Sequence, residues 1–292
     1  MKLLDGKKVS AEIKEELKSK IREEKERSGR VPGLGIIQIG HNEAASVYVQ
    51  SQLKGSRALG MESYLYSFDD SVEEETVLKK IKELNQTEEI DGIILQLPLP
   101  KHISHSRILQ AIDVNKDVDG FKTENIGRLH LGEEGFNPCT PEGVIALLKK
   151  YDIEIASKNV TIIGRSNIVG KPMFGLFINH NATVTICNSL TKNLKEHTER
   201  ADIIVVAVGK EKFLTADMVR EGAIVIDVGI NRSREGKIVG DVDFEAVAPK
   251  ASYITPVPGG VGSMTVAMLF QNIWKAFIRN RRIINGEKNK GE

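Results

Sequence analysis

The stretch SVYVQSQLK places an aromatic ring, an amide and an amine within one short segment, just after an apolar run that ends at Gly40. On a helix of about 3.6 residues per turn, Tyr48 and Gln52 lie one turn apart and share a face, whereas Lys54 points about 200° away from Gln52. If this face meets a substrate, it offers a ring and an amide. The ionisable amine lies on the wrong side for proton transfer there.

The segment VTIIGRSNIVGKP carries the strongest local signal in the chain. A buried strand is expected to end at Gly164, and a tight turn with Arg165 and Ser166 follows it. Gly170 then lets the backbone approach closely, and Pro172 starts a helix. Backbone N–H groups and the helix dipole favour a pyrophosphate at this point. Ser166 stands where G-x-G-x-x-G has its second glycine, so a purely structural turn remains the alternative.

The end of the next strand, CNSLTK, bears on the choice of cofactor. An NAD site usually places Asp or Glu there, about 20 residues beyond the glycines, to hold the ribose 2′-hydroxyl. Asn188 and Ser189 are neutral, Lys192 is near, and Arg165 projects from the first turn. A 2′-phosphate would meet donors and positive charge, which favours NADP over NAD. The alternative is that Asn188 and Ser189 merely form a turn.

Other polar or glycine-rich segments stand at predicted strand ends. ILQLPLP puts the amide of Gln96 inside an apolar strand, where a missing partner costs about 1 to 3 kcal/mol, so a ligand, a side chain, a water or a backbone group should satisfy it. KDVDGF places Asp117 and Asp119 before Gly120, a pattern more typical of turns. Residues 255–265, TPVPGGVGSMT, suit backbone lying against a flat ligand, or an ordinary rigid loop.

Composition excludes several classes of protein. The 292 residues carry 41 basic and 40 acidic side chains for a net charge of +1, so no nucleic-acid or membrane partner is indicated. His102 and His105 lack a third ligand, and Cys139 and Cys187 stand far apart, so neither a metal site nor a disulfide framework is expected. The N-terminus shows no export signal and no window approaches about 18 apolar residues. We expect a soluble cytoplasmic protein with a small-molecule partner.

Short apolar runs alternate with amphipathic segments, which predicts an α/β fold with parallel sheets. Helices are expected over 44–59, with Gly60 as C-cap, and over 72–85. The strands are expected at residues 33–40, 62–68, 91–100, 160–164, 182–187, 202–209, 223–230 and 252–258.

Two connecting helices divide the chain into domains. The first covers 137–151, with Thr140 as N-cap and Pro141 at the first helical position. The second covers 264–278 and packs back on the first domain. The expected domains are 1–139 together with about 264–284, and 140–263, framing one cleft.

Seven motifs occur in one order along the chain: DGIILQLPLP, KDVDGF, PCTPEGV, GRSNIVGKP, GAIVIDVGIN, GDVDF and PVPGGVGSMTVAML. In these the chain closely resembles the methylenetetrahydrofolate dehydrogenase/methenyltetrahydrofolate cyclohydrolase family, often called FolD, over nearly its whole length. The resemblance implies an N-terminal folate-binding catalytic domain and a C-terminal Rossmann domain that binds NADP. It also implies a homodimer, a tetrahydrofolate derivative as substrate and a role in one-carbon metabolism.

The resemblance also implies roles for individual residues. Tyr48 stacks on the folate pterin, and Gln96 and Asp119 contact its polar edge. The implied catalytic residues are Tyr48, Gln52, Gln96 and Asp119. Leu97, Pro258, Gly259 and Gly260 join them in substrate binding. The implied cofactor-binding residues are Gly164, Arg165, Ser166, Ile168, Ser189, Gly209, Ile230 and Thr265.

The chain departs from the family pattern at Gln52. The pattern has a lysine four residues after the tyrosine, and that lysine is associated with the cyclohydrolase step; Lys54 has a counterpart in many relatives and is not a displaced copy. Hydride transfer depends on alignment rather than on a titrating base. Hydrolysis of the methenyl product needs proton transfers that a lysine of lowered pKa supplies and an amide cannot.

We therefore expect an NADP-dependent methylenetetrahydrofolate dehydrogenase with weak or absent cyclohydrolase activity, because lost acid–base help costs about 10² to 10⁴ in rate. The main alternative is a fully bifunctional enzyme in which a neighbouring group takes over. A two-domain dehydrogenase of another substrate and a non-catalytic dinucleotide-binding module are the remaining alternatives.

Overall fold

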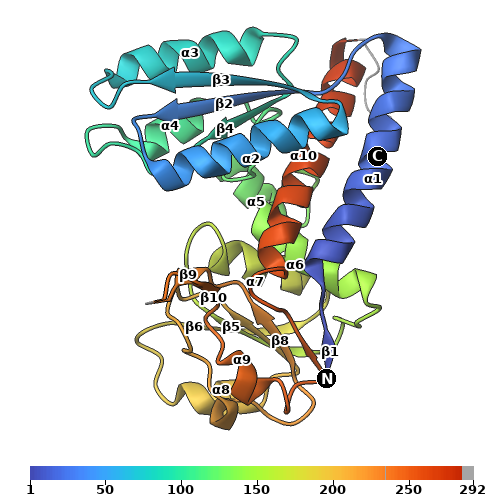
Figure 1. Ribbon diagram of the computed structural model, residues 1–292, viewed down its shortest axis with the longest axis vertical. Coiled ribbons are helices and arrows are strands. Elements are labelled where there is room, and N and C mark those ends of the chain that lie inside the picture. The colour runs from blue at the N-terminus through green and yellow to red at the C-terminus, as the bar shows by residue number, and fades with distance from the viewer. Residues whose placement is uncertain (234, 285–292) are drawn as a thin grey trace. The chain divides into compact units, whose positions relative to one another are not determined.

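The computed structural model describes residues 1–233 and 235–284, and it confirms the predicted α/β class (Figure 1). The chain divides into two compact units. Unit 1 consists of Met1–Glu12 and Arg128–Met268, and unit 2 consists of Ile13–Gly127 and the chain from Leu269. The first residues belong to unit 1 because β1 (Lys2–Leu3) pairs with β11 (Tyr253–Ile254). The predicted boundaries of the two functional domains stay a prediction.

Unit 1 is built on a six-stranded parallel sheet in the order β1-β11-β8-β7-β5-β6. Its four longest strands are β5 (Asn159–Ile163), β6 (Thr183–Cys187), β7 (Ile203–Val206) and β8 (Ile224–Asp227), with β6 at one edge. They coincide with predicted strands. β6 ends at Cys187 as predicted, whereas β5, β7 and β8 end earlier than predicted, because the chain leaves the sheet at the carboxyl edge. From β5 the chain passes to β6 on one side and then to β7 on the other. Such a reversal makes a crevice at the carboxyl ends, where ligands bind in open α/β sheets.

Helices cover this sheet, and a separate antiparallel pair of short strands belongs to the same unit. The helices are α6 (Cys139–Lys150), α7 (Gly170–Asn179), α8 (Leu194–Glu199), α9 (Phe244–Val247) and the 3₁₀ turn η1 (Ala216–Met218). The strands β9 (Asn231–Arg232) and β10 (Ile238–Val239) form the antiparallel pair. Their two-residue length gives no periodic signal, so the sequence did not predict them.

The start of α6 differs from the prediction. Pro138 is the N-cap, so Thr140 lies inside the helix and Pro141 is not at its first position. The Thr140 hydroxyl instead lies 2.9 Å from the Thr265 hydroxyl on α10 (Val261–Ile284). Proline is tolerated there because the N–H groups of a first turn have no partner within the helix. The prediction of Thr140 as a cap was wrong because it could not include this interhelical bond.

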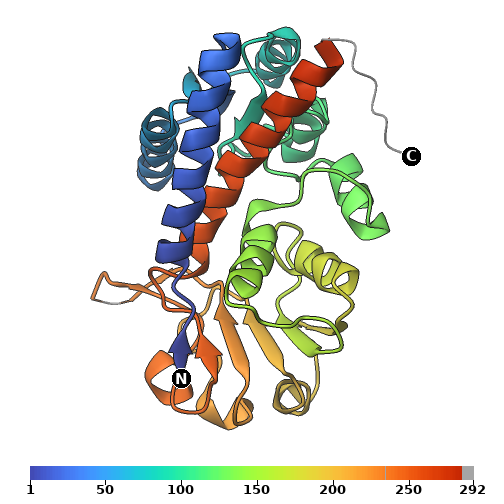
Figure 2. The same ribbon diagram turned by 90° about the vertical axis from the view of Figure 1, so that its right-hand side faces the viewer.

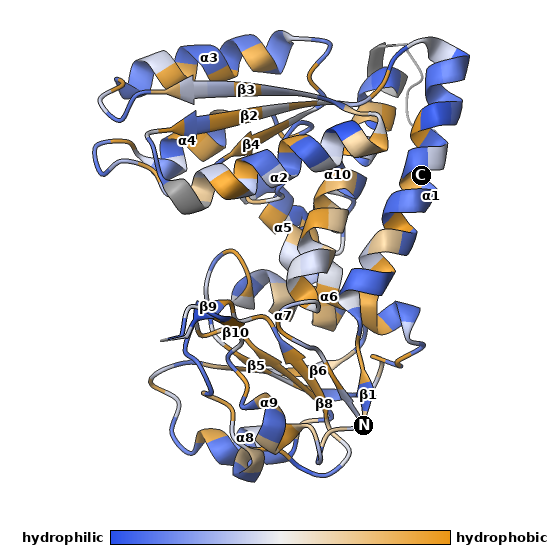
Figure 3. Cartoon of the chain, in the orientation of Figure 1, coloured by the Kyte–Doolittle hydropathy of each residue, from blue (hydrophilic) through white to orange (hydrophobic). Residues whose placement is uncertain are grey.

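Unit 2 contains a three-stranded parallel sheet in the order β3-β2-β4. The strands are β2 (Gly33–Ile39), β3 (Glu62–Phe68) and β4 (Gly92–Leu95), and β2 and β4 are apolar in Figure 3. The helices are α2 (Glu43–Leu59), α3 (Glu74–Gln86), α4 (His105–Ala111) and α5 (Thr123–Leu131), which runs on into unit 1. Gly60 caps α2 in the left-handed conformation at φ 81°, as predicted.

Two long helices complete unit 2. The part of α1 (Gly6–Ser28) in this unit lies beside α10 in both views (Figures 1 and 2). An ion pair joins Glu24 to Arg281, and the Lys14 ammonium lies 5.9 Å from the centre of the Phe270 ring. Helix α10 is longer than predicted at both ends. None of the helices in the described residues is apolar over a length that could cross a membrane.

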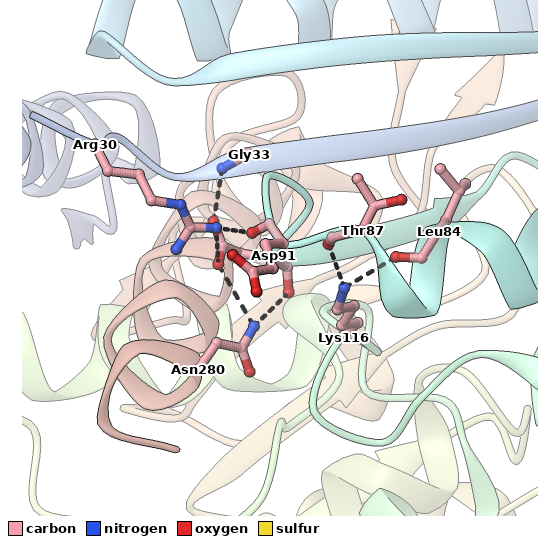
Figure 4. Close-up of polar contacts among 8 residues, drawn as sticks. Arg30, Gly33, Leu84, Thr87, Asp91, Lys116 and Asn280 are labelled. Atoms are coloured by element: carbon pink, nitrogen blue, oxygen red, sulfur yellow. Dashed lines mark hydrogen bonds and ion pairs between the residues drawn. The ribbon is translucent and has the colours of Figure 1, made fainter. Parts of the chain in front are cut away.

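Buried charged groups fix the amino-terminal edge of the unit 2 sheet (Figure 4). The fully buried Asp91 carboxylate accepts from the Gly33 N–H at 2.9 Å and from Arg30 at 3.0 Å. The Lys116 ammonium donates to the Leu84 and Thr87 carbonyls at the end of α3, at 2.9 and 2.8 Å. Burial raises the pKa of Asp91 and lowers the pKa of Lys116. These groups are structural, since ligands bind at the opposite edge of parallel sheets.

Candidate functional site

The carboxyl edge of the unit 1 sheet exposes aliphatic side chains. Ile168, Leu190, Val208 and Ile230 follow β5, β6, β7 and β8, and their exposed fractions are 43%, 79%, 36% and 67%. An apolar rim at the switch point of a parallel sheet suits the flat rings of a ligand. Ile168 and Ile230 were predicted to bind the cofactor. Leu190 and Val208 were missed, although each is an apolar residue standing in a polar turn.

Two glycines shape the turn after β5. Gly164 has φ 123°, and a Cβ there would lie 2.2 Å from the Ala207 carbonyl oxygen. A Cβ on Gly170 would lie 2.1 Å from the Gly164 carbonyl oxygen. At each position a Cβ would clash with a backbone carbonyl oxygen, so only glycine fits. The predicted role of Gly170, close approach of strand and helix, is confirmed.

The Ser166 side chain lies in the turn that leads into the next helix, whose N-cap is Val169. Its hydroxyl accepts from the N–H groups of Val169 and Gly170 at 3.2 and 3.4 Å, and α7 begins at Gly170 rather than at Pro172. Two N–H groups that were expected to meet a pyrophosphate are thus already bonded within the turn. The exposed Arg165 supplies the positive charge that this turn offers an anion.

The turn after β6 contains no carboxylate. Asn188 accepts from the Leu190 N–H through its side chain at 3.0 Å and from the Thr191 N–H through its carbonyl at 2.9 Å. The structural alternative therefore holds for Asn188, whose side chain is part of the turn. Ser189 is exposed beside it. A 2′-phosphate fits this edge because hydroxyl and guanidinium donors are available and no acidic side chain repels it.

The other residues predicted for unit 1 have mixed environments. Gly209 is exposed with φ 67°, and its N–H donates to Asp241 at 2.9 Å. The Thr265 hydroxyl is engaged with Thr140 and with the Val261 carbonyl. Pro258 is exposed. Gly259 has φ 106°, and a Cβ there would lie 3.9 Å from Pro256 Cγ. Gly260 is buried against Gly6, where a Cβ would lie 2.1 Å from the Gly260 oxygen. Gly260 thus packs against the start of α1.

In unit 2, α2 presents Tyr48 and Gln52. Tyr48 is 39% exposed, while Gln52, one turn further on, is 2% exposed. The Gln52 Oε1 atom has no hydrogen-bond partner within the described residues. Lys54 is exposed, which confirms that it points away from Gln52. A buried amide oxygen without a partner costs about 1 to 3 kcal/mol, which a ligand donor would recover.

The end of β4 lies next to β2, because the Gln96 N–H donates to the Ile37 carbonyl at 2.8 Å. The strand ends at Leu95, so Gln96 is half-buried rather than inside the strand, and this part of the prediction was wrong. Pro98 cannot donate to a sheet and helps to end the strand. The Gln96 amide donates to the Leu97 carbonyl at 2.8 Å, which is the backbone contact named as an alternative. Leu97 is exposed beside it.

Asp119 is half-buried in the loop that follows the pairing of Asp117 with Ile93 on β4. Asp117 accepts from the Lys122 N–H and from the Asn125 amide, both at 2.8 Å, so it forms the predicted turn. Burial, with a further contribution from Asp117, raises the pKa of Asp119 to about 7. Burial also raises the pKa of Asp117, and its hydrogen bonds to the Asn125 amide and to the Lys122 N–H oppose that shift.

Lys14 was not singled out from the sequence. It is half-buried on α1, and burial lowers the pKa of its ammonium. The ring of Phe270 that it covers also fills the space at Gly55 of α2, where a Cβ would lie 2.6 Å from that ring. An amine of lowered pKa thus lies near α2, in a position that periodicity alone does not reveal.

A parallel sheet with a glycine turn at its switch point, an apolar rim and no acidic side chain after β6 defines a dinucleotide-binding protein of the Rossmann class. The sequence profile of the tetrahydrofolate dehydrogenase/cyclohydrolase NAD(P)-binding domain matches residues 138–281, and that of the catalytic domain matches residues 4–119. The chain belongs to this tetrahydrofolate dehydrogenase/cyclohydrolase family.

Known proteins are similar to this chain in sequence and structure over nearly its full length. The bifunctional protein FolD of Campylobacter hominis is 54% identical over 276 residues, which are 94% of this chain and 97% of that protein. The crystal structure of the bifunctional FolD enzyme of Campylobacter jejuni has a TM-score of 0.94 at 50% identity, covering 96% of this chain and 99% of the other. The Trypanosoma brucei enzyme, solved with NADP and an inhibitor, has a TM-score of 0.90 at 35% identity, covering 95% and 97%.

Proposed function

We propose that this chain is an NADP-dependent 5,10-methylenetetrahydrofolate dehydrogenase with weak or absent methenyltetrahydrofolate cyclohydrolase activity. Family membership and the NADP-bound relative support the dehydrogenase. The observation that carries the second part is Gln52, a buried neutral amide on the face of α2 that also bears Tyr48. The exposed Lys54 does not replace a lysine at that position.

In the proposed reaction, one set of residues binds and orients the folate and another set binds NADP. NADP, when bound, supplies the acceptor for a hydride that leaves the one-carbon bridge of the folate, and positive charge then spreads over the two folate nitrogens. Tyr48 orients the pterin by stacking, and Gln96 and Asp119 hold its polar edge. Arg165 and Ser189 hold the 2′-phosphate, while Ile168 and Ile230 cover the rings. Alignment of this kind supplies much of the rate without a titrating base.

Gln52 can support the hydride-transfer step by binding, but it cannot catalyse the hydrolysis that follows. Its unpartnered Oε1 can accept a hydrogen bond from the bound folate or from a water. Hydrolysis of the methenyl product requires a group that takes a proton from water and delivers one to a ring nitrogen. An amide does neither near neutral pH.

A bifunctional enzyme remains the second candidate because of Lys14. Burial lowers the pKa of its ammonium, which is the direction of shift that a general acid or base of lysine type needs. Two measurements separate the candidates. Methylenetetrahydrofolate with NADP should give rapid reduction of the cofactor, and NAD should give less. Methenyltetrahydrofolate should be hydrolysed at the buffer rate by the wild type; hydrolysis that disappears in Lys14→Met would establish the bifunctional alternative instead.

The same assays address the other classes. NADP reduction with another alcohol or amine, and none with the folate, would identify a dehydrogenase of a different substrate. Binding of NADP without any reduction would identify a non-catalytic module.

We further propose that the protein is a homodimer. The edge strand β3 supports this, because Tyr64 and Leu65 on it are exposed and an uncovered edge strand attracts another chain. Light scattering should give twice the mass of one chain, and Leu65→Lys should shift the protein toward the monomer.

A further inference from the structure

Two buried carboxylates join the loops that follow β7 and β8. Asp241 is separated from the end of β10 by one glycine and is fully buried. Asp227 is the last residue of β8 and is 4% exposed. Burial raises the pKa of Asp227 to about 6. Carboxylates buried this deeply need dedicated donors, so their partners show what they hold in place.

The Asp241 carboxylate accepts three successive backbone N–H groups. Val208 and Gly209 donate to Oδ2 at 2.7 and 2.9 Å, and Lys210 donates to Oδ1 at 2.9 Å. Consecutive N–H groups that converge in this way form a nest for an anion. Asp241 therefore fills, from within the chain, a position that would otherwise attract a phosphate. The loop after β7 is held by this carboxylate.

The loop after β8 is attached to the same residue. The Asn231 amide donates to Asp241 Oδ1 at 2.8 Å and to the Gly240 carbonyl at 3.2 Å. Asp227 Oδ1 accepts from the Gly229 N–H and from the Asp241 N–H, both at 2.9 Å. The two carboxylates thus form one connected network between the loops.

Glycines let the backbone reach both carboxylates. A Cβ on Gly229 would lie 2.2 Å from the Asp241 carboxyl carbon, and a Cβ on Gly240 would lie 1.9 Å from Asp227 Oδ2. No side chain fits at either place. The spacing between the loops is therefore fixed by close contact as well as by hydrogen bonds.

These loops carry Val208 and Ile230, exposed on the β7 and β8 side of the switch point. Arg165 and Ser189 stand on the β5 and β6 side, where the 2′-phosphate of the adenosine half belongs. A dinucleotide that crosses the switch point puts its nicotinamide half on β7 and β8. We propose that Asp241 is a positioning residue that fixes the loops for the nicotinamide half of NADP. This inference rests on the proposed function, because it takes NADP as the cofactor.

One consequence concerns Gly209. Its N–H donates to Asp241, so at Gly209 the loop offers a ligand space rather than a backbone donor. No atom lies within 4 Å of an added Cβ on Gly209. We therefore expect Gly209 to contact the cofactor by van der Waals packing rather than by a backbone hydrogen bond.

The test uses Asp241→Asn and two ligands. Asparagine keeps the shape but turns one acceptor oxygen into an NH₂ group that faces N–H donors. The Kd for NADP should rise about tenfold, as expected when a ligand-facing loop loses its fixed position. The Kd for adenosine 2′,5′-bisphosphate, which has only the adenosine half, should equal that of the wild type.

Asp202→Asn is the matched control, because Asp202 accepts from the Asn159 N–H at 2.8 Å and pairs with Arg220 at the opposite edge of the same sheet. It should lower Tm and leave both Kd values unchanged. If Asp241→Asn does not fold, Asn231→Ala removes one donor to Asp241 and should raise the Kd for NADP alone, by a smaller factor.

The positioning role would be overturned if the folded variant kept the wild-type Kd for NADP. It would also be overturned if the Kd values for NADP and for adenosine 2′,5′-bisphosphate rose by the same factor. Failure of the proposed function has a different signature, since the wild type itself would then not bind NADP.

Discussion

Gln52 and Lys54 lie two residues apart on α2 and have opposite environments: the amide is buried and the amine is exposed. The angle of about 200° between them on a helix makes this arrangement fixed, because no rotamer of Lys54 crosses the helix. Tyr48 marks the face of α2 on which Gln52 lies. The proposed loss of hydrolysis depends on this relationship, since it leaves the face of α2 that bears Tyr48 and Gln52 without an amine of its own.

Gln52→Lys should confer cyclohydrolase activity. A lysine at this buried position has a lowered pKa, because burial disfavours the charged form, and can then transfer protons near neutral pH. We expect hydrolysis of methenyltetrahydrofolate to increase by about 10² or more. Loss of absorbance of the methenyl compound measures the rate.

Gln50→Lys is the matched control, because Gln50 is exposed on the same helix. It should leave hydrolysis unchanged. An equal gain in both variants would show that the added charge, rather than its place, is responsible.

Asp119 should make substrate binding depend on pH. Its pKa of about 7 means that the ionised form, which accepts from the N–H groups of a pterin, is lost as the pH falls through 7. If only the ionised form binds, KM for methylenetetrahydrofolate should be about tenfold higher at pH 6 than at pH 8. In Asp119→Asn, KM should be raised and flat over this range. A wild-type KM that does not change with pH would contradict the role.

The same carboxyl group should cost stability when it is ionised. Its pKa in the folded protein lies above the ordinary value of 3.8, so the folded state binds the proton more tightly and stability falls as the pH rises from about 4 to about 7. Asp119→Asn should therefore raise Tm at pH 8 and change it little at pH 4. Calorimetry at both pH values measures the difference. A uniform shift would assign the effect to packing.

Ser189→Asp should reverse part of the cofactor preference. A carboxylate after β6 repels the 2′-phosphate of NADP and accepts from the 2′-hydroxyl of NAD. The ratio of kcat/KM for NADP to that for NAD should fall about tenfold or more. Ser189→Asn, which adds similar bulk without charge, should keep the preference for NADP. An identical ratio in the two variants would place the 2′-phosphate elsewhere.

Arg30→Met should destabilise the protein without affecting the reaction. Arg30 pairs with the fully buried Asp91 at 3.0 Å. Removing one member of a buried pair costs about 3 to 5 kcal/mol, and we expect the lower end of this range because the Arg30 side chain is 27% exposed. Burial already raises the pKa of Asp91, and the loss of Arg30 raises it further. The destabilisation should therefore shrink as the pH falls and Asp91 takes up a proton. Arg57→Met, at an exposed position, is the control for urea unfolding.

The central strands could be predicted because parallel strands that are buried on both faces read as unbroken apolar runs. The cores of β2, β5 and β7 correspond to such runs. Their ends could not be predicted as well, because the apolar run of β4 continues past the point where the chain leaves the sheet. This is why Gln96 was wrongly placed inside a strand.

The site could be predicted where a residue type has a local requirement. Gly164 and Gly170 occupy a turn that has no room for a Cβ. The outward direction of Lys54 follows from the angle between residues on a helix. Asp241 could not be found in this way, because its donors lie about 30 residues earlier in the chain. Lys14 was missed for a similar reason, since its burial depends on Phe270 at the other end of the sequence.

The most direct test of the account is the rate at which the wild-type protein hydrolyses 5,10-methenyltetrahydrofolate without NADP, compared with the rate at which it forms that compound from 5,10-methylenetetrahydrofolate and NADP. We expect brisk formation and hydrolysis no faster than in buffer alone. Enzymatic hydrolysis at a rate comparable with formation would contradict the assignment of Gln52 as the cause of a lost second activity.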